Sequence, residues 1–250
     1  MKAAIQRIRT RIPVIHGLMA LAGAVGLKWY YSGADGSDLA WILSPTAALV
    51  AGLTGIDFVS AGGEGYLAPA AGVVIAPACA GVNFLIIAFL TGAFTGIRPR
   101  RPAFGILISA ALMAYGLTVA VNAVRIIVSM GLYDAPIYTG PITPERVHRI
   151  GGVLVYFPAL LAFHAVLSRF RSRAVEDKAG PLRIPAAPMA WYLGIALGVP
   201  IIHAGLQGRP IPVGEHAATV VAVAVGISIL TAAGRRACHR LREAIESRRM

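Results

Sequence analysis

The sequence predicts an all-α fold, a polytopic bundle of six to seven transmembrane helices, on three observations. Of its 250 residues, 57% are hydrophobic and 14% are charged, and the mean hydropathy is +0.70, which is typical of membrane proteins. Apolar segments long enough to cross a bilayer, about 20 residues each, use up the chain, so we expect one integral-membrane domain over residues 1–250. Lys and Arg gather where these segments end.

The first predicted span, residues 13–31, follows a basic flank and is read as an uncleaved helix, because no small-x-small cleavage site follows it. Asp35, Gly36 and Asp38 are expected to form a turn. Further helices are expected over 39–55, from Cys79 to Ile97, from Ala103 to about Tyr133, from Val147 to about Leu167, and over about 189–206 and 216–233.

The connections carry Gly, Pro or charge. Residues 56–76 are too polar and too rich in Gly for a span, so we expect a short loop region at the outer face before Cys79, with a candidate strand at Gly72–Ile75. Residues 134–146 hold three prolines and are read as a loop. The tail, residues 235–250, is basic and is expected to form a cytoplasmic surface helix.

The basic residues also predict orientation. The net charge of +12 is attributed to Lys and Arg in cytoplasmic loops rather than to nucleic-acid binding. If the N-terminus and Arg98–Arg101 are both cytoplasmic, an even number of spans must separate them, yet three candidates do. Either residues 39–55 are re-entrant or lie in the outer interface, or the N-terminus is outside. Pro45 and the small residues near it favour the first interpretation.

The stretch Pro77–Phe84 is the centre of the functional hypothesis. Proline suits a first helical turn, so we expect a helix that begins at about Pro77 with Cys79 in its first turn. The positive end of a helix favours the thiolate, which is the nucleophilic form of cysteine. The alternative is that Cys79 is a small buried apolar residue.

Three ionisable residues are predicted to lie at one depth. Counted from the basic cytoplasmic stops, Cys79, Arg125 and His148 are roughly 28, 33 and 32 Å away along their helices. Ionisable groups at membrane level are costly and point to function. Taken alone, Arg125 could be an interfacial arginine that reaches headgroups, and His148 could be a polar helix start.

Together these residues suit acyl transfer. Cys79 is the predicted nucleophile, His148 the general acid or base, and Arg125 the stabiliser of the oxyanion. Asn83, Asn122 and Glu145 are candidate supporting residues, although the asparagines could equally make helix-packing hydrogen bonds and Glu145 could simply charge a helix start.

No cofactor or metal is expected, because the sequence has no H-x-x-x-H pair and no C-x-x-C. The second cysteine, Cys238, lies in the basic tail at the predicted opposite face, which argues against a disulfide with Cys79.

Three blocks resemble the signature blocks of the exosortase/archaeosortase family: Pro-Ala-Cys-Ala-Gly-Val-Asn (77–83), Val-Asn-Ala-Val-Arg-Ile (121–126) and Val-His-Arg-Ile-Gly-Gly (147–152). Asn-Phe-Leu (83–85), which follows Ala-Gly-Val, with Leu-Ser-Pro-Thr-Ala (43–47) upstream, is most similar to the exosortase K branch. The common family block reads Cys-Ser-Gly, whereas this chain has Ala80 after the cysteine, which bears on the subtype more than on the activity.

The resemblance implies a multispanning cysteine protease or transpeptidase of the inner membrane with its site at the outer, periplasmic face. It matches Cys79 to the nucleophile, Arg125 to the family arginine and His148 to the histidine. The implied partners are exported proteins with a C-terminal sorting signal, made of a short motif, a transmembrane helix and a basic cluster. Membrane lipids surround both chains, and the new C-terminus is expected to pass to an acceptor.

The main alternative is a polytopic transporter in which Arg125 is a substrate-binding charge. It does not explain a Cys and a His at the same level, and no internal repeat is visible. A haem protein needs paired axial histidines, whereas His148 and His164 are at opposite ends of one predicted helix. A serine intramembrane protease would need a G-x-S-x-G-like elbow, which is missing.

Overall fold

The computed structural model describes residues 2–96, 103–133 and 143–172, with 193–194, 221–222, 225–226 and 229. For residues 2–13, 144–146, 149 and 171–172 it describes the backbone alone. The chain divides into two compact units, 1–167 and 168–250, and every element named here lies in the first, apart from the end of the last helix. The predicted spans at 189–206 and 216–233, the loop at 134–142 and the basic tail lie largely or wholly outside the described residues.

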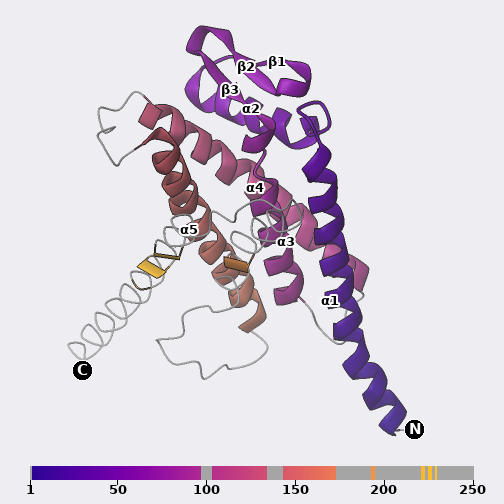
Figure 1. Ribbon diagram of the computed structural model, residues 1–250. Helices are drawn as coiled ribbons and strands as arrows, with labels where there is room; N and C mark the ends of the chain where they lie inside the picture. Colours follow the sequence, from indigo (N-terminus) through magenta and orange to yellow (C-terminus); the bar gives the residue numbers. More distant parts are fainter. Residues whose placement is uncertain are drawn as a thin grey trace, which may run out of the picture. The chain divides into compact units, whose positions relative to one another are not determined.

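Five helices and a small sheet make up the described part (Figure 1). Most of the expected helices are confirmed, with longer ends for the first and the fifth. The elements are α1 (Lys2–Gly33), α2 (Ala40–Thr54), β1 (Val59–Ser60), η1 (Gly62–Glu64), β2 (Tyr66–Ala68), η2 (Pro69–Ala71), β3 (Val73–Ile75), η3 (Pro77–Cys79), α3 (Val82–Gly96), α4 (Ala103–Tyr133) and α5 (Pro144–Ser172).

Small residues let the long helices approach one another. α3 packs most closely on α4, and α1 packs on α3. A Cβ added at Gly92 of α3 would lie 3.2 Å from the Cβ of Ala110 on α4, and one added at Gly17 of α1 would lie 3.3 Å from the ring of Phe94. Close backbone approach through small residues is how helices associate in membranes, where the apolar lipid provides no hydrophobic drive.

Three described helices are long and apolar enough to cross a membrane: Pro77–Gly96, Phe104–Tyr133 and Ile150–Phe170. Large apolar side chains project outward along them, among them Phe104 and Leu112 on α4 and Phe170 on α5. Such outward apolar surface is expected on helices that contact lipid. This finding indicates a membrane protein; the full count of six to seven spans remains a prediction, as does the span at 13–31 within α1.

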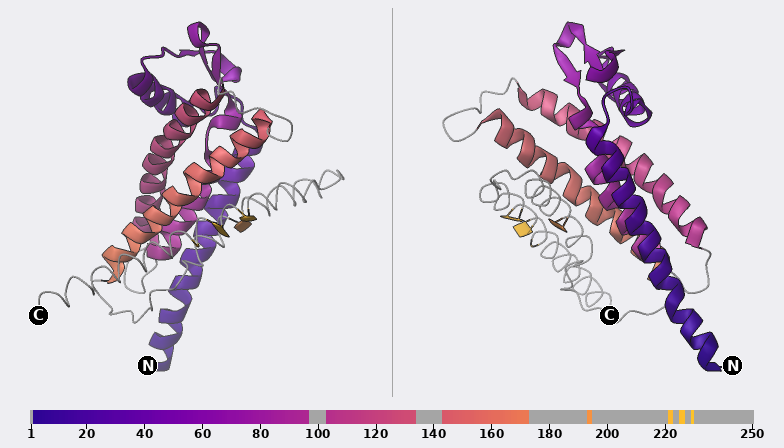
Figure 2. Two further views of the ribbon diagram at one scale, coloured as in Figure 1. Left: turned by 90° about the vertical axis from the view of Figure 1, so that its left-hand side faces the viewer. Right: turned by 45° about the vertical axis from the view of Figure 1, so that its right-hand side comes forward.

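Helix α2 lies at the end of the bundle where α1 and α4 end and α3 and α5 begin, next to the sheet (Figures 1 and 2). We call this the sheet end. α2 has 15 residues, which is about 22 Å of helix, less than the hydrocarbon core of about 30 Å. The length and place of α2 favour the interpretation in which residues 39–55 do not cross the bilayer.

Pro45 lies inside α2 without breaking the helix. Because proline has no N–H, the carbonyl of Trp41 four residues earlier lacks its usual donor within the helix. The hydroxyl of Tyr115 on α4 donates to that carbonyl over 2.8 Å, and the rings of Trp41 and Tyr115 stack with their centroids 5.9 Å apart. The group that Pro45 leaves unpaired therefore fastens α2 to α4.

A three-stranded antiparallel sheet occupies residues 59–75, where the sequence predicted mainly a loop region, so the expectation of an all-α chain is corrected here. Leu67 of the central strand pairs with Val59 on one side and Val74 on the other, and the expected strand at Gly72–Ile75 is present as β3. Strands of two or three residues are too short for alternation to be read from sequence, which explains the miss.

The predicted turn after α1 is confirmed. The Asp35 carboxylate accepts hydrogen bonds from the backbone N–H groups of Ser37 and Asp38 and from the Ser37 hydroxyl. These bonds hold the pKa of Asp35 below its ordinary value, and the bond from the Ser37 side chain contributes most. Position 36 requires glycine, because a Cβ here would collide with the backbone nitrogen of Gly65.

We predict that Tyr115→Phe lowers the free energy of unfolding by about 1 kcal/mol, since it removes the only hydrogen bond described for the Trp41 carbonyl. In a Pro45→Ala background, the restored N–H can donate to that carbonyl. Tyr115→Phe should therefore lower the free energy of unfolding clearly less in this background. Thermal unfolding of the four proteins in detergent checks this non-additivity. Equal costs in both backgrounds would contradict the role assigned to Pro45.

Candidate active site

Cys79 lies in a 3-10 turn, not in the first turn of an α-helix as the sequence predicted. Its N–H donates to the Ala76 carbonyl over 2.7 Å, and the N–H of Ala80 donates to the Pro77 carbonyl over 3.0 Å. α3 begins only at Val82. The thiol is free and half-buried, at the sheet end of the bundle. The expected alignment with the helix dipole is therefore replaced by a turn that leads into the helix.

Gly81 is the reason that the two elements are separate. Its φ of +72° lies in the left-handed region, which interrupts the helix between Cys79 and Val82. A Cβ at Gly81 would lie 3.2 Å from Cγ of Asn122, 3.3 Å from Cγ2 of Thr118 and 3.3 Å from the Tyr156 hydroxyl. The position therefore requires glycine both for its backbone conformation and for space.

Asn122, a buried residue on α4, joins this turn to the rest of the site. Its Nδ2 donates to the backbone carbonyl of Cys79 over 2.6 Å. Its Oδ1 accepts from the Tyr156 hydroxyl over 2.7 Å and from Nη1 of Arg125 over 3.5 Å. Asn122 thus contacts its neighbour Arg125 and also makes a hydrogen bond to another element, the backbone of the candidate nucleophile.

Arg125 is buried one turn further along α4 and points toward α5. Its Nη2 lies 2.5 Å from Nε2 of His148. Its guanidinium also lies over the ring of Tyr156, 5.5 Å from the centroid. Nε of Arg125 is buried and makes no hydrogen bond in the described part of the chain. Its described partners are therefore a neutral amide, an imidazole and an aromatic ring.

The contact between Arg125 and His148 fixes the form of the imidazole. A guanidinium has no acceptor, so Nε2 of His148 must accept and the proton must be on Nδ1. Nδ1 then donates to the hydroxyl of Ser129, 3.4 Å away on α4. His148 precedes the apolar span that begins at Ile150, and both its partial burial and the charge of Arg125 lower the pKa of its ring. At neutral pH the ring is therefore an uncharged base.

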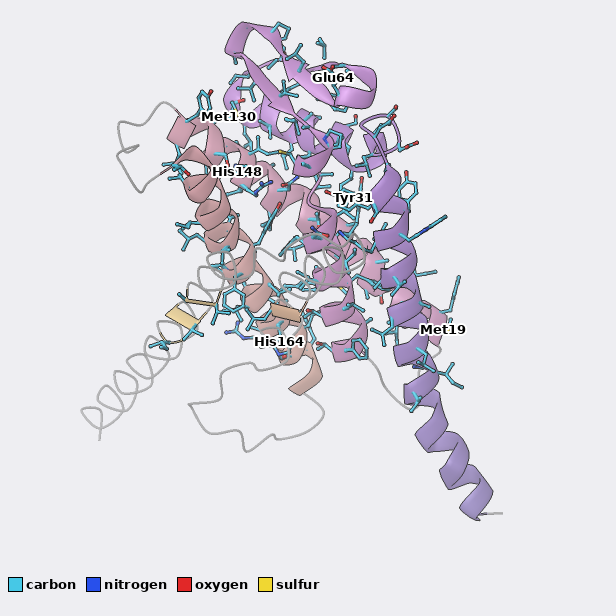
Figure 3. All side chains as sticks on the ribbon, viewed as in Figure 1. Met19, Tyr31, Glu64, Met130, His148 and His164 are labelled. Carbon is cyan, nitrogen blue, oxygen red and sulfur yellow. The ribbon has the colours of Figure 1, made fainter. Side chains whose placement is uncertain are left out.

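Lys28 forms a second cationic position at the sheet end. Its Nζ donates to Oδ1 of Asn83 over 3.0 Å and lies 5.0 Å from the ring centroid of Tyr31. Asn83 thus contacts Lys28 and has no described bond to Cys79, its expected neighbour. The Tyr31 hydroxyl is within electrostatic range of both Cys79 and Arg125. Figure 3 shows Tyr31 and His148 near the sheet end, and His164 toward the other end of α5.

The structure brings the three sequence blocks together, two of them through side chains and the first through the backbone of Cys79. Arg125 contacts His148 directly, whereas Cys79 is linked to Arg125 through its carbonyl and Asn122. The side chain of Glu145 lies outside the described residues.

The sequence interpretation missed four contributors: Lys28, Ser129, Tyr31 and Tyr156. Of these, only Lys28 gave a usable signal, a charge within an apolar run.

No cluster of His, Cys, Asp and Glu that could hold a metal ion is present among the residues described. No family model, curated protein or solved structure matches this chain.

We predict opposite effects for two Gly→Ala substitutions. Gly81→Ala should lower the thermal midpoint, since the side chain would meet Asn122 and strain a residue with positive φ. Gly116→Ala, in the interior of α4 with open space around it, should leave the midpoint unchanged or raise it, as alanine favours helix by about 1 kcal/mol. Thermal unfolding in detergent compares them, and a Gly81→Ala protein as stable as Gly116→Ala would contradict this account.

Proposed function

We propose that this chain is a membrane-embedded cysteine protease or transpeptidase of the exosortase type. The observation that carries the proposal is a continuous set of contacts from the Cys79 carbonyl through Asn122 to Arg125 and His148. These groups come from three blocks on three different elements. The types that converge are a thiol, a fixed cation and a neutral imidazole, which are the groups that acyl transfer needs.

In the proposed reaction, the Cys79 thiol gives its proton to Nε2 of His148 and the thiolate attacks a peptide carbonyl. A carbon–sulfur bond forms and the carbonyl electron pair moves to oxygen, where Arg125 stabilises the negative charge. Collapse of this intermediate breaks the carbon–nitrogen bond, and the leaving amine takes the proton from His148. Water or an acceptor nucleophile then resolves the thioester and restores the thiol.

Arg125 has two successive partners in this scheme. While Nη2 of Arg125 donates to Nε2 of His148, that nitrogen cannot take a proton. Arg125 must therefore turn from His148 to the substrate carbonyl when the substrate arrives, which frees the base at the same step that supplies the oxyanion partner. The Nδ1–H bond to Ser129 keeps the ring oriented through this change.

The proposed substrates are exported proteins that end in a short motif, a transmembrane helix and a basic cluster. Such a helix would lie in the bilayer beside α3, α4 and α5 and bring the motif to the depth of Cys79. We place the sheet end at the periplasmic face of the inner membrane, on the distribution of Lys and Arg.

We predict that Cys79→Ser, Arg125→Lys and His148→Gln leave the protein inserted and folded but reduce processing by at least about 100-fold. The protein would be co-expressed with a neighbouring protein that carries such a C-terminus, whose size is followed on a gel. Cys238→Ser is the matched control and should process normally. Mass analysis of the product would show whether water or an acceptor took the acyl group.

Undiminished processing by Cys79→Ser would rule out Cys79 as the nucleophile. The interpretation of the chain as a transporter, with Arg125 as a substrate-binding charge, would then gain weight. The comparison requires equal amounts of each variant in the membrane fraction, so that a loss of processing reports chemistry rather than expression.

We predict that the processing rate falls on the acid side below pH 6.5. The pKa of His148 is lowered, so the neutral base is present at and above pH 6.5, its ordinary value, and is lost only as the pH falls further. Rates measured between about pH 5 and 8 on purified protein, with folding checked at each pH, test the sign. A rate that rises as the pH falls below 6.5 would contradict a neutral His148 base.

A further inference from the structure

Tyr156 on α5 contacts Asn122 and Arg125 and approaches the Cys79 turn at Gly81, although it belongs to none of the three sequence blocks. Its hydroxyl donates to Oδ1 of Asn122 over 2.7 Å. Its ring stacks on Phe84 of α3, with centroids 4.6 Å apart and planes 13° from parallel. The guanidinium of Arg125 on α4 lies 5.5 Å from the same ring centroid. One side chain therefore connects α5 to both α3 and α4.

The hydroxyl of Tyr156 helps to fix which way the Asn122 amide points. Nδ2 must face the Cys79 carbonyl, because two acceptors would otherwise meet there. Oδ1 must face Arg125 for the opposite reason, but that bond is long, at 3.5 Å. The 2.7 Å bond from Tyr156 is the short one on this oxygen. Without it, the buried amide oxygen keeps only the weak contact to Arg125.

Tyr156 also lies against the turn that holds the thiol. Its oxygen would be 3.3 Å from a Cβ at Gly81, so it approaches the backbone two residues after Cys79. With Asn122 and Thr118 it forms the surface against which Gly81 lies. A shift of Tyr156 is therefore passed to the thiol by two routes: the backbone of the turn and the amide that binds the Cys79 carbonyl.

We propose that Tyr156 is a positioning residue: through Asn122 it fixes the position of the Cys79 turn relative to the Arg125 guanidinium. Its role in the reaction rests on the function proposed for this chain, but its coupling to Cys79 can be measured without any substrate. A bulky packing residue would give α5 a contact surface and nothing more. A positioning residue must instead change the reactivity of the thiol, and must do so through Asn122.

The first test is the rate at which iodoacetamide alkylates Cys79 at pH 7 in the purified full-length protein, with Cys238→Ser as background. Tyr156→Phe keeps the stacked ring and removes the hydroxyl, and we expect about fivefold slower alkylation, the factor that corresponds to one lost hydrogen bond. Tyr156→Leu also removes the ring beneath Arg125 and should slow it further. Tyr115→Phe is the matched control, because its hydroxyl bonds the Trp41 carbonyl away from Cys79, and it should leave the rate unchanged.

The second test asks whether Tyr156 acts through Asn122. If it does, adding Tyr156→Phe to Asn122→Ala slows alkylation no further than Asn122→Ala alone. Additive effects, or equal rates in Tyr156→Phe and the background protein, would overturn the proposal. This outcome is separate from the failure of the proposed function: if Cys79→Ala still processed substrate, the enzyme assignment would fall while the measured coupling between Tyr156 and Cys79 would stand.

Discussion

The hydrogen bond from the Asn122 amide to the Cys79 carbonyl is the contact on which the arrangement of the site depends. It binds a backbone group, so it holds the turn itself and leaves the thiol free to react. The other end of the amide faces Tyr156 and Arg125. Because an amide has a donor side and an acceptor side, it can join a carbonyl to a hydroxyl and a cation only in one orientation. Among the described residues, that polarity gives the site a defined geometry through neutral groups.

The two cations of the site, Arg125 and Lys28, contact neutral groups. Among the described side chains, Arg125 has an imidazole, an amide and a ring as partners, and Lys28 has an amide and a ring. Dipoles and aromatic faces lower the cost of holding a cation at membrane depth without cancelling its charge. The uncancelled charge is what a reaction with a developing oxyanion requires. A carboxylate beside Arg125 would hold the same residue in place and remove most of that benefit.

The helices could be predicted from sequence because runs of apolar residues between basic or proline-rich stops are a long-range signal, as α4 over Ala103–Tyr133 illustrates. The proximity of Arg125 and His148 agrees with the helix rise counted from the basic stops, whereas their depth in a membrane stays a prediction. The sheet could not be predicted, because its strands are two or three residues long, and neither could the turn at Cys79, which depends on the positive φ of Gly81. Tyr156 gave no signal, since a tyrosine in an apolar helix looks like any packing residue until its hydroxyl partner is known.

The order in which the helices are synthesised gives the contacts of these two cations a further meaning. Lys28 is synthesised with α1, but its partner Asn83 belongs to α3, and Arg125 on α4 contacts Tyr156 and His148 only once α5 is present. Each cation therefore lacks its described interhelix partners until a later helix has inserted. We therefore expect folding intermediates of low stability, and quality control could recognise an unfinished chain by a charge that still lacks its partners.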